Sequence, residues 1–190
     1  MAEVIFKAYP KEIILSDGTG LTLRPLRAGD EEALHRMFGR FPPDDRWFLE
    51  GDVTDFDLIK RWVNQRDSEK KVALVGELEG RIIAHAYLNR RYYGSKGHVG
   101  KIRVSVDPAF RERHLGTWVL LDLVNLAMSM GLELLVMDLV EGRDVSVIRG
   151  LKKLDFDQEA VLKGYVRDQE GLSNNLVIMV KRLHQGWKDQ

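Results

Sequence analysis

The chain has 190 residues, and its 29 lysine and arginine residues balance 29 aspartate and glutamate residues, so the formal net charge is zero. This length suits a single domain with an ordinary core. A composition of 44% hydrophobic and 31% charged residues excludes a disordered or fibrous chain. The zero balance argues against a protein that mainly coats nucleic acid or an anionic membrane, because such binding needs net positive charge.

The sequence contains no cysteine. This excludes disulfides, thiolate zinc sites, iron–sulfur clusters and a cysteine nucleophile, and we predict no metal site. The first fifteen residues lack the basic and apolar regions of a signal peptide. The most apolar stretch, Val119–Val140, contains too many polar residues to span a bilayer. We therefore expect a cytoplasmic domain without a membrane partner.

Hydrophobic periodicity predicts the elements in chain order. Leu21–Arg24 alternates like a strand that ends at Pro25, and the next apolar stripe predicts a helix that begins near Asp30, its expected N-cap, and ends at Phe41-Pro42-Pro43-Asp44. Further helices and strands follow without a repeat or linker, which predicts one mixed α/β or α+β domain. These are a helix over 55–64, strands over 71–78, 82–88 and 98–106, a helix over 116–130, a strand over 132–139, a helix over 145–154, and a closing hairpin over 160–166 and 176–183.

The segment from Asp107 to Thr117 joins a predicted strand to a predicted helix. A loop at this place exposes free backbone N–H groups at the positive end of the helix, which is a preformed anion site. Arg111 and Arg113 add positive charge, and Gly116 lets the backbone approach a ligand closely. The loop therefore predicts a phosphate or pyrophosphate site, with an ordinary basic loop as the alternative.

Three segments resemble the GNAT superfamily of N-acetyltransferases. Val104–Thr117 is similar to its acyl-CoA-binding segment, where Arg111 takes the Gln/Arg place of the Gln/Arg-x-x-Gly-x-Gly/Ala loop, His114 replaces the first glycine and Gly116 is the second. The run Leu23-Arg24-Pro25-Leu26-Arg27-Ala28-Gly29-Asp30 resembles the family's opening, and Lys153-Leu154-Asp155-Phe156 its Tyr-x-x-Leu-Gly-Phe segment.

The resemblance spans residues 20–183 and implies an α+β fold in a single domain over 1–190. The expected core is a mostly antiparallel, twisted sheet of about seven strands flanked by about four helices. It also implies acetyl-CoA as cosubstrate. Backbone of the 98–106 strand would pair with the pantetheine arm, and loop N–H groups would hold the pyrophosphate. The implied binding residues are Val104, Ser105, Val106, Arg111, Glu112, Arg113, His114, Leu115, Gly116, Thr117 and Asp144.

The sequence departs from the family pattern where catalysis is expected. Leu151 stands in place of the tyrosine that many relatives use as general acid, and Gly100 in place of a glutamate that serves some as base. His98, two residues before Gly100 on the same strand face, is a candidate base, with an ordinary surface histidine at a strand start as the alternative. Glu141 and Tyr93 are candidates beside the acceptor, although a solvated strand end and a loop aromatic are the alternatives.

We expect an N-acetyltransferase that transfers an acetyl group from acetyl-CoA, without a covalent enzyme intermediate, to a primary amine of a small molecule, amino acid or protein. A non-catalytic acyl-CoA-binding module and a phosphate- or nucleotide-binding protein are the alternatives. No nucleic-acid partner is expected. The resemblance leaves a homodimer open, formed through an exposed strand or the final hairpin.

The balanced total charge divides into two segments of opposite sign. Residues 90–114 hold seven basic against two acidic residues, and residues 28–57 hold nine acidic against three basic ones. The first surrounds the expected pyrophosphate loop, and the resemblance places the second, with Trp47 and Phe48, beside the acceptor. This distribution predicts a cationic acceptor.

Overall fold

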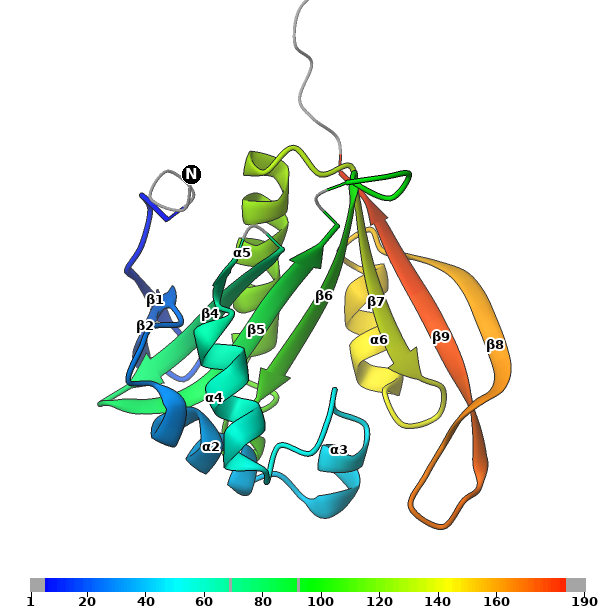
Figure 1. Ribbon diagram of the computed structural model, residues 1–190, viewed down its shortest axis with the longest axis horizontal. Helices are drawn as coiled ribbons and strands as arrows, with labels where there is room; N and C mark the ends of the chain where they lie inside the picture. Colours follow the sequence, from blue (N-terminus) through cyan, green and yellow to red (C-terminus); the bar gives the residue numbers. More distant parts are fainter. Residues whose placement is uncertain (1–5, 69, 92, 184–190) are drawn as a thin grey trace, which may run out of the picture.

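The computed structural model describes residues 6–68, 70–91 and 93–183, and one twisted sheet organises this part of the chain (Figure 1). The strand order is β1-β2-β4-β5-β6-β7-β9-β8, with β3 beside β4. Neighbouring strands in the described sheet pair antiparallel, except that β6 pairs parallel with β7. The strands are β1 (Lys11–Ile14), β2 (Gly20–Pro25), β3 (Asp67–Ser68), β4 (Lys71–Leu78), β5 (Arg81–Arg90), β6 (Val99–Val106), β7 (Leu134–Val140), β8 (Asp157–Arg167) and β9 (Ser173–Arg182).

Helices cover both faces of the sheet and bury two apolar clusters. One face packs against α5 and α6, and the other packs against α2 and α4 over the β4–β5 region (Figure 1). None of the helices in the described ranges is both long and apolar enough to cross a membrane. The helices are α2 (Glu31–Gly39), α3 (Pro43–Trp47), α4 (Phe56–Asn64), the 3-10 turn η1 (Pro108–Phe110), α5 (Leu115–Ser129) and α6 (Val145–Lys152).

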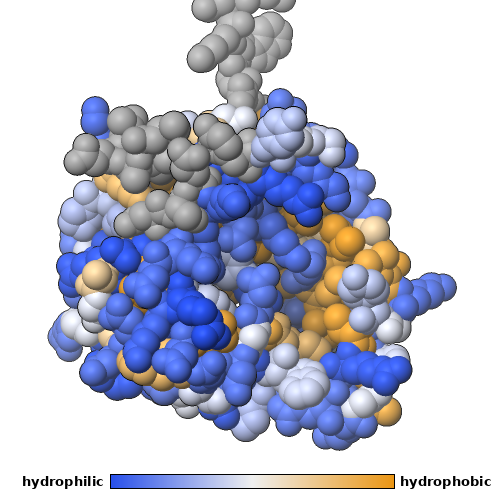
Figure 2. All heavy atoms as spheres, in the orientation of Figure 1, coloured by the Kyte–Doolittle hydropathy of each residue, from blue (hydrophilic) through white to orange (hydrophobic). Residues whose placement is uncertain are grey.

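The predicted α+β fold is confirmed, and the predicted helices and strands all form with shifted ends. The sheet has more strands than expected because the short β1 and β3 pair at one side of it. Pro43 was expected only to end a helix, but it also begins α3, since its fixed φ suits the first helical turn. Among the described helices, none covers the α2 side of β7, β9 and β8, and Figure 2 shows apolar surface over these strands. By strand register, half-buried Val136, Ile178 and Leu162 face this side.

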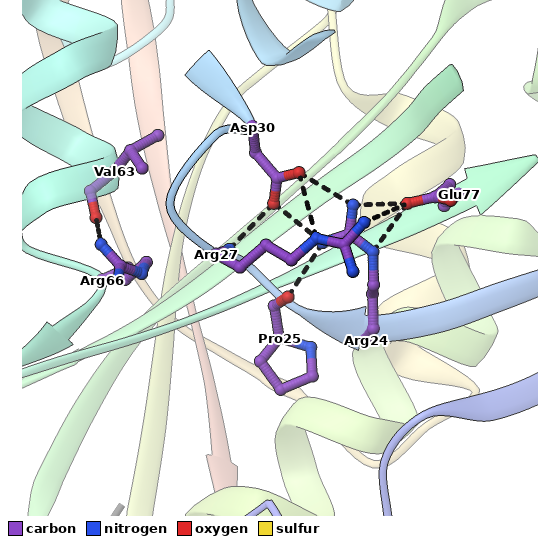
Figure 3. A network of polar contacts seen from close by, with 7 residues as sticks. All are labelled: Arg24, Pro25, Arg27, Asp30, Val63, Arg66 and Glu77. Atoms are coloured by element: carbon purple, nitrogen blue, oxygen red, sulfur yellow. Dashed lines mark hydrogen bonds and ion pairs between the residues drawn. The ribbon is translucent and has the colours of Figure 1, made fainter. Parts of the chain in front are cut away.

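Asp30 stands at the N-cap position of α2, as predicted, but its carboxylate does not cap the helix. It accepts hydrogen bonds from the guanidinium of Arg24 at 2.8 and 2.9 Å and from the Arg27 N–H at 2.8 Å (Figure 3). Glu77 of β4 binds the same guanidinium. Because Arg24 is only 8% exposed, its charge needs these carboxylates. Residues 23–30, which resemble the start of GNAT sequences, therefore fix the corner between β2 and α2 to the sheet.

Candidate functional site

Strands β6 and β7 pair over a short stretch and then separate. The parallel register joins Val99 to Leu134 and Lys101 to Val136, and it ends there. Beyond Lys101, β6 continues to Val106 with β5 on one side and no described strand on the other. Figure 1 shows the two strands diverging toward the α3 end of the sheet. We call the place where β6 and β7 separate the opening. There one edge of β6 is available to an extended ligand that pairs like a strand.

The loop after β6 leads directly into the start of α5, where the sequence predicts an anion site. Glu112 and His114 both have φ of 62°, so His114 adopts the left-handed conformation that its place in the glycine position predicted. The first helical N–H with an acceptor is that of Trp118, which donates to the His114 carbonyl at 3.1 Å. The N–H groups of residues 112–117 find no acceptor in the described chain. Six free donors at the positive helix end favour an anion.

Both loop arginines already contact carboxylates. Arg111 lies 2.7 Å from Asp45 of α3, and Arg113 donates to Asp17 at 2.7 Å. Arg143, which follows β7, donates to the other oxygen of Asp45 at 2.7 Å. Burial opposes ionisation of Asp45, but hydrogen bonds and charge from the two arginines outweigh it and lower the pKa. Asp45 therefore links the chain after β6 to the chain after β7.

Asp107 fixes the start of the loop through hydrogen bonds from α2-side and β5 arginines, a role that the sequence did not suggest. It is 1% exposed, and it accepts hydrogen bonds from Arg40 at 2.6 Å, from Arg81 at 3.0 Å and from the Ala109 N–H at 3.1 Å. Burial opposes its ionisation, but these donors outweigh burial and lower its pKa. Gly116 contributes open space, because an added Cβ would meet only a Val106 methyl at 3.6 Å.

The predicted binding residues of β6 and of the loop after it lie at this end of the strand. Val104, Ser105 and Val106 lie on the part of β6 that has no neighbour on the β7 side, and residues 111–117 follow at its end. Asp144 lies across the opening at the end of β7. Its carboxylate accepts from the Val140 N–H at 2.7 Å and from Arg143 at 2.6 Å, so it closes the strand end.

The three predicted catalytic residues do not lie together. His98 is exposed before the paired end of β6, where its carbonyl accepts from the Leu134 N–H. Glu141 follows the far end of β7, about 20 Å away at strand spacing, and accepts from Asn175 at 2.7 Å. Tyr93 is 93% exposed in the loop before β6.

Gly100, the position that holds a glutamate base in some relatives, faces the apolar core. A Cβ there would lie 2.6–3.0 Å from three leucines of the core under α5, Leu88, Leu132 and Leu135. That strand face is filled by apolar side chains. Leu151 is likewise 2% exposed in the same core, so neither position offers a group that could carry a proton.

The opposite face of β6 carries a polar cluster that sequence reasoning missed. We call it the Tyr87 cluster, and its members are Glu50, Lys71, Tyr87 and Arg103. The Tyr87 hydroxyl donates to Glu50 at 2.5 Å, and Arg103 donates to the Phe48 carbonyl at 2.6 Å. The Lys71 ammonium lies 4.7 Å from the Tyr87 ring centre and 5.2 Å from that of Trp62. These contacts join residues from β4, β5, β6 and the loop after α3.

Burial controls ionisation in the Tyr87 cluster. It raises the pKa of Tyr87, and the Glu50 carboxylate raises it further. Burial lowers the pKa of Lys71, although the charge of Glu50 opposes this. The buried Nε2 of neighbouring His85 has no hydrogen-bond partner among the described residues, and burial together with the charge of Lys71 lowers the pKa of His85 to about 3. The sequence carried a signal for part of this cluster, because His85 and Tyr87 alternate on one face of a strand whose neighbour begins with Lys71.

The match to a family model decides the family. The acetyltransferase (GNAT) family model matches residues 32–156, more than half of the chain. The chain belongs to the GNAT family. A search of curated proteins found no match. Solved GNAT structures share the fold: the GNAT domain of PAT from S. lividans is 16% identical with a TM-score of 0.76, covering 93% of this chain and 98% of that one.

Two further GNAT structures have the same fold at similar distance. The structure of yncA, a putative acetyltransferase from Salmonella typhimurium with its cofactor acetyl-CoA, is 20% identical with a TM-score of 0.75, covering 90% of this chain and 98% of that chain. The ribosomal-protein-S18-alanine N-acetyltransferase from Escherichia coli is 16% identical with a TM-score of 0.70, again covering 90% and 98%. At these identities the likeness supports the fold.

Proposed function

We propose that this GNAT protein transfers an acetyl group from acetyl-CoA to a primary amine. The observation that carries the proposal is the run of free N–H groups over residues 112–117, which lies directly after the unpaired edge of β6. Free N–H groups bind a pyrophosphate, and an unpaired strand edge pairs with an extended arm that contains amides. Their order along the chain matches the order of these groups in CoA.

The placement of the cosubstrate follows from this order. The N–H groups of Arg113–Thr117 would hold the pyrophosphate, and Arg111 would add a positive charge. Backbone of Val104–Val106 would pair with the pantetheine arm, and the thioester would then lie in the opening between β6 and β7. An N–H group of β6 on this side would polarise the thioester carbonyl.

The chemistry is a direct acyl transfer. The acceptor nitrogen attacks the thioester carbon, the C–N bond forms, and the C–S bond breaks with its electron pair on sulfur. Starting from an ammonium, the products are the amide, the CoA thiol and one proton. Proximity in the opening supplies much of the rate. The assignments of His98, Glu141 and Tyr93 to proton transfer stay predictions.

A panel of amines with acetyl-CoA tests the proposal, with release of free thiol as the readout. We expect turnover that depends on the amine and an acetylated product of matching mass. Arg113→Ala should raise KM for acetyl-CoA, whereas Arg61→Ala on the exposed side of α4 should not. Absence of acetyl-CoA binding would overturn the whole proposal.

One observation favours a non-catalytic CoA-binding module as the second candidate. The position expected to hold a tyrosine acid carries Leu151, which is 2% exposed in the core and has no proton to donate. The module would bind CoA tightly and release no thiol with any amine. Calorimetry with CoA beside the turnover assay separates the two candidates.

A further inference from the structure

The Tyr87 cluster lies beside the place where the thioester is proposed to sit. Tyr87 of β5 pairs in register with Arg103 of β6, so their side chains are neighbours on one sheet face. Arg103 is two residues beyond Lys101, where pairing with β7 ends, and it directly precedes Val104. The cluster is on the face opposite the α5 core. An acceptor that approaches the opening from this face meets the cluster first.

Two cations of the cluster have no carboxylate partner. Lys71 is 9% exposed, and within the described ranges no carboxylate oxygen comes within 4.0 Å of its ammonium. In the part of the chain that the structure describes, the only acceptor of Arg103 is the Phe48 carbonyl. The nearby Lys101 differs, because it forms an ion pair with Asp138 at 2.6 Å. The cluster therefore offers two positive groups to an anionic substituent.

Glu50 supplies the single negative group. Tyr87 donates to its Oε2, its Oε1 has no partner in the part of the chain described, and the residue is exposed. Other acids of the 28–57 segment are engaged within the fold: Asp30 with Arg24, Asp45 with two arginines, and Asp55 with the N–H of α4. The segment's surplus of acids therefore does not by itself make the acceptor side anionic.

We propose that the acceptor is an amino-carboxylate, a small molecule with an amino group and a carboxylate a few bonds apart, such as an amino acid. Its ammonium binds Glu50, and its carboxylate binds Arg103 and Lys71. This rests on the proposed function and specifies its substrate class. A polyamine or a lysine side chain lacks the anionic group and would bring positive charge toward two cations that form no ion pair within the described ranges.

Matched pairs of acceptors test the substrate class. Each L-amino acid is compared with the amine that has the same side chain and no carboxylate, using kcat/KM for thiol release and, separately, binding to the CoA-loaded protein by ligand-observed NMR. We expect at least one amino acid to exceed its amine by about 10-fold to 100-fold, the range for hydrogen bonds to charged groups. Equal values within each pair would overturn the inference and leave the acetyltransferase function standing.

Substitutions in the cluster show whether these residues create the preference. Arg103→Met and Lys71→Met should each raise KM for the amino acid about 10-fold while kcat/KM for the matching amine stays constant or rises. Arg61→Met and Lys60→Met on α4 are matched controls that should change neither value. Arg103 is half-buried, so it provides a second variant if Lys71→Met does not fold. Equal losses for both members of a pair would overturn the inference.

The NMR binding measurement separates failure of the amino-carboxylate inference from failure of the acetyltransferase function. If the CoA-loaded protein binds an amino acid but releases no thiol, acetyl transfer is wrong and the amino-carboxylate site stands. If it acetylates amines and binds no amino acid in preference to its amine, the site is wrong and the transferase function stands. If it neither binds nor acetylates any member of the panel, the inference is overturned as well.

Discussion

Asp45 of α3 lies 2.7 Å from Arg111 in the loop after β6, so a carboxylate already binds one of the two guanidinium groups in the loop proposed to hold the pyrophosphate. The same carboxylate binds Arg143 beyond β7 at 2.7 Å. These contacts tie α3 to the chain segments that follow the two strands of the opening. A bound CoA phosphate and Asp45 would therefore compete for the same positive charge.

Replacing Asp45 with asparagine should tighten CoA binding. The substitution removes one negative charge near a polyanionic ligand and frees Arg111, and we expect a gain of about 3-fold at low salt that fades at high salt. Calorimetry at two salt concentrations measures it. Asp44→Asn changes the net charge equally, and Asp44 forms no ion pair within the described ranges, so this variant serves as the control. Weaker CoA binding by Asp45→Asn would show that Asp45 instead holds Arg111 in its binding geometry.

Gly116 should be replaceable without loss of the fold but not without loss of CoA binding. A Cβ there meets only a Val106 methyl at 3.6 Å, an ordinary contact, whereas a branched side chain would extend over the free N–H groups. We expect Gly116→Val to weaken CoA binding at least about 10-fold with a change in unfolding free energy below about 1 kcal/mol. Gly39→Val at the end of α2 is the matched control. Unchanged CoA affinity in Gly116→Val would place the pyrophosphate elsewhere.

Sequence periodicity was sufficient for the longer helices and strands and for the course of the loop after β6, because these depend on local chemistry. The apolar stripe of α5 and the need for positive φ at His114 are properties of neighbouring residues. The Tyr87 cluster could not be predicted in this way, since Glu50 and Tyr87 are 37 residues apart and meet only when the loop after α3 folds over β5. Strand alternation predicted that His98 and Gly100 share a face, but it does not determine which face of the strand is core.

Gly100 should tolerate no side chain. A Cβ would lie 2.6 Å from a Leu88 methyl, 2.9 Å from one of Leu132 and 3.0 Å from one of Leu135, so the core must shift. We expect Gly100→Ala to lower the unfolding free energy by about 1–3 kcal/mol. Gly150→Ala in α6, where a Cβ meets nothing within 4 Å, should instead raise it by about 0.5–1 kcal/mol. Chemical denaturation measures both, and a neutral Gly100→Ala would contradict the packing argument.

His85 should make the protein sensitive to acid. The imidazole is 2% exposed and has a pKa of about 3 in the folded state, against 6.5 when unfolded. Above pH 6.5 it is neutral in both states, and between pH 6.5 and 3 only the unfolded chain takes up the proton, so stability falls as the pH falls. From pH 7 to pH 5 this loss is about 2 kcal/mol. His85→Leu should remove that part of the decline, and exposed His98→Leu should retain it. If denaturation at the two pH values gives the same decline for His85→Leu as for the unmodified protein, His85 is not the group that titrates.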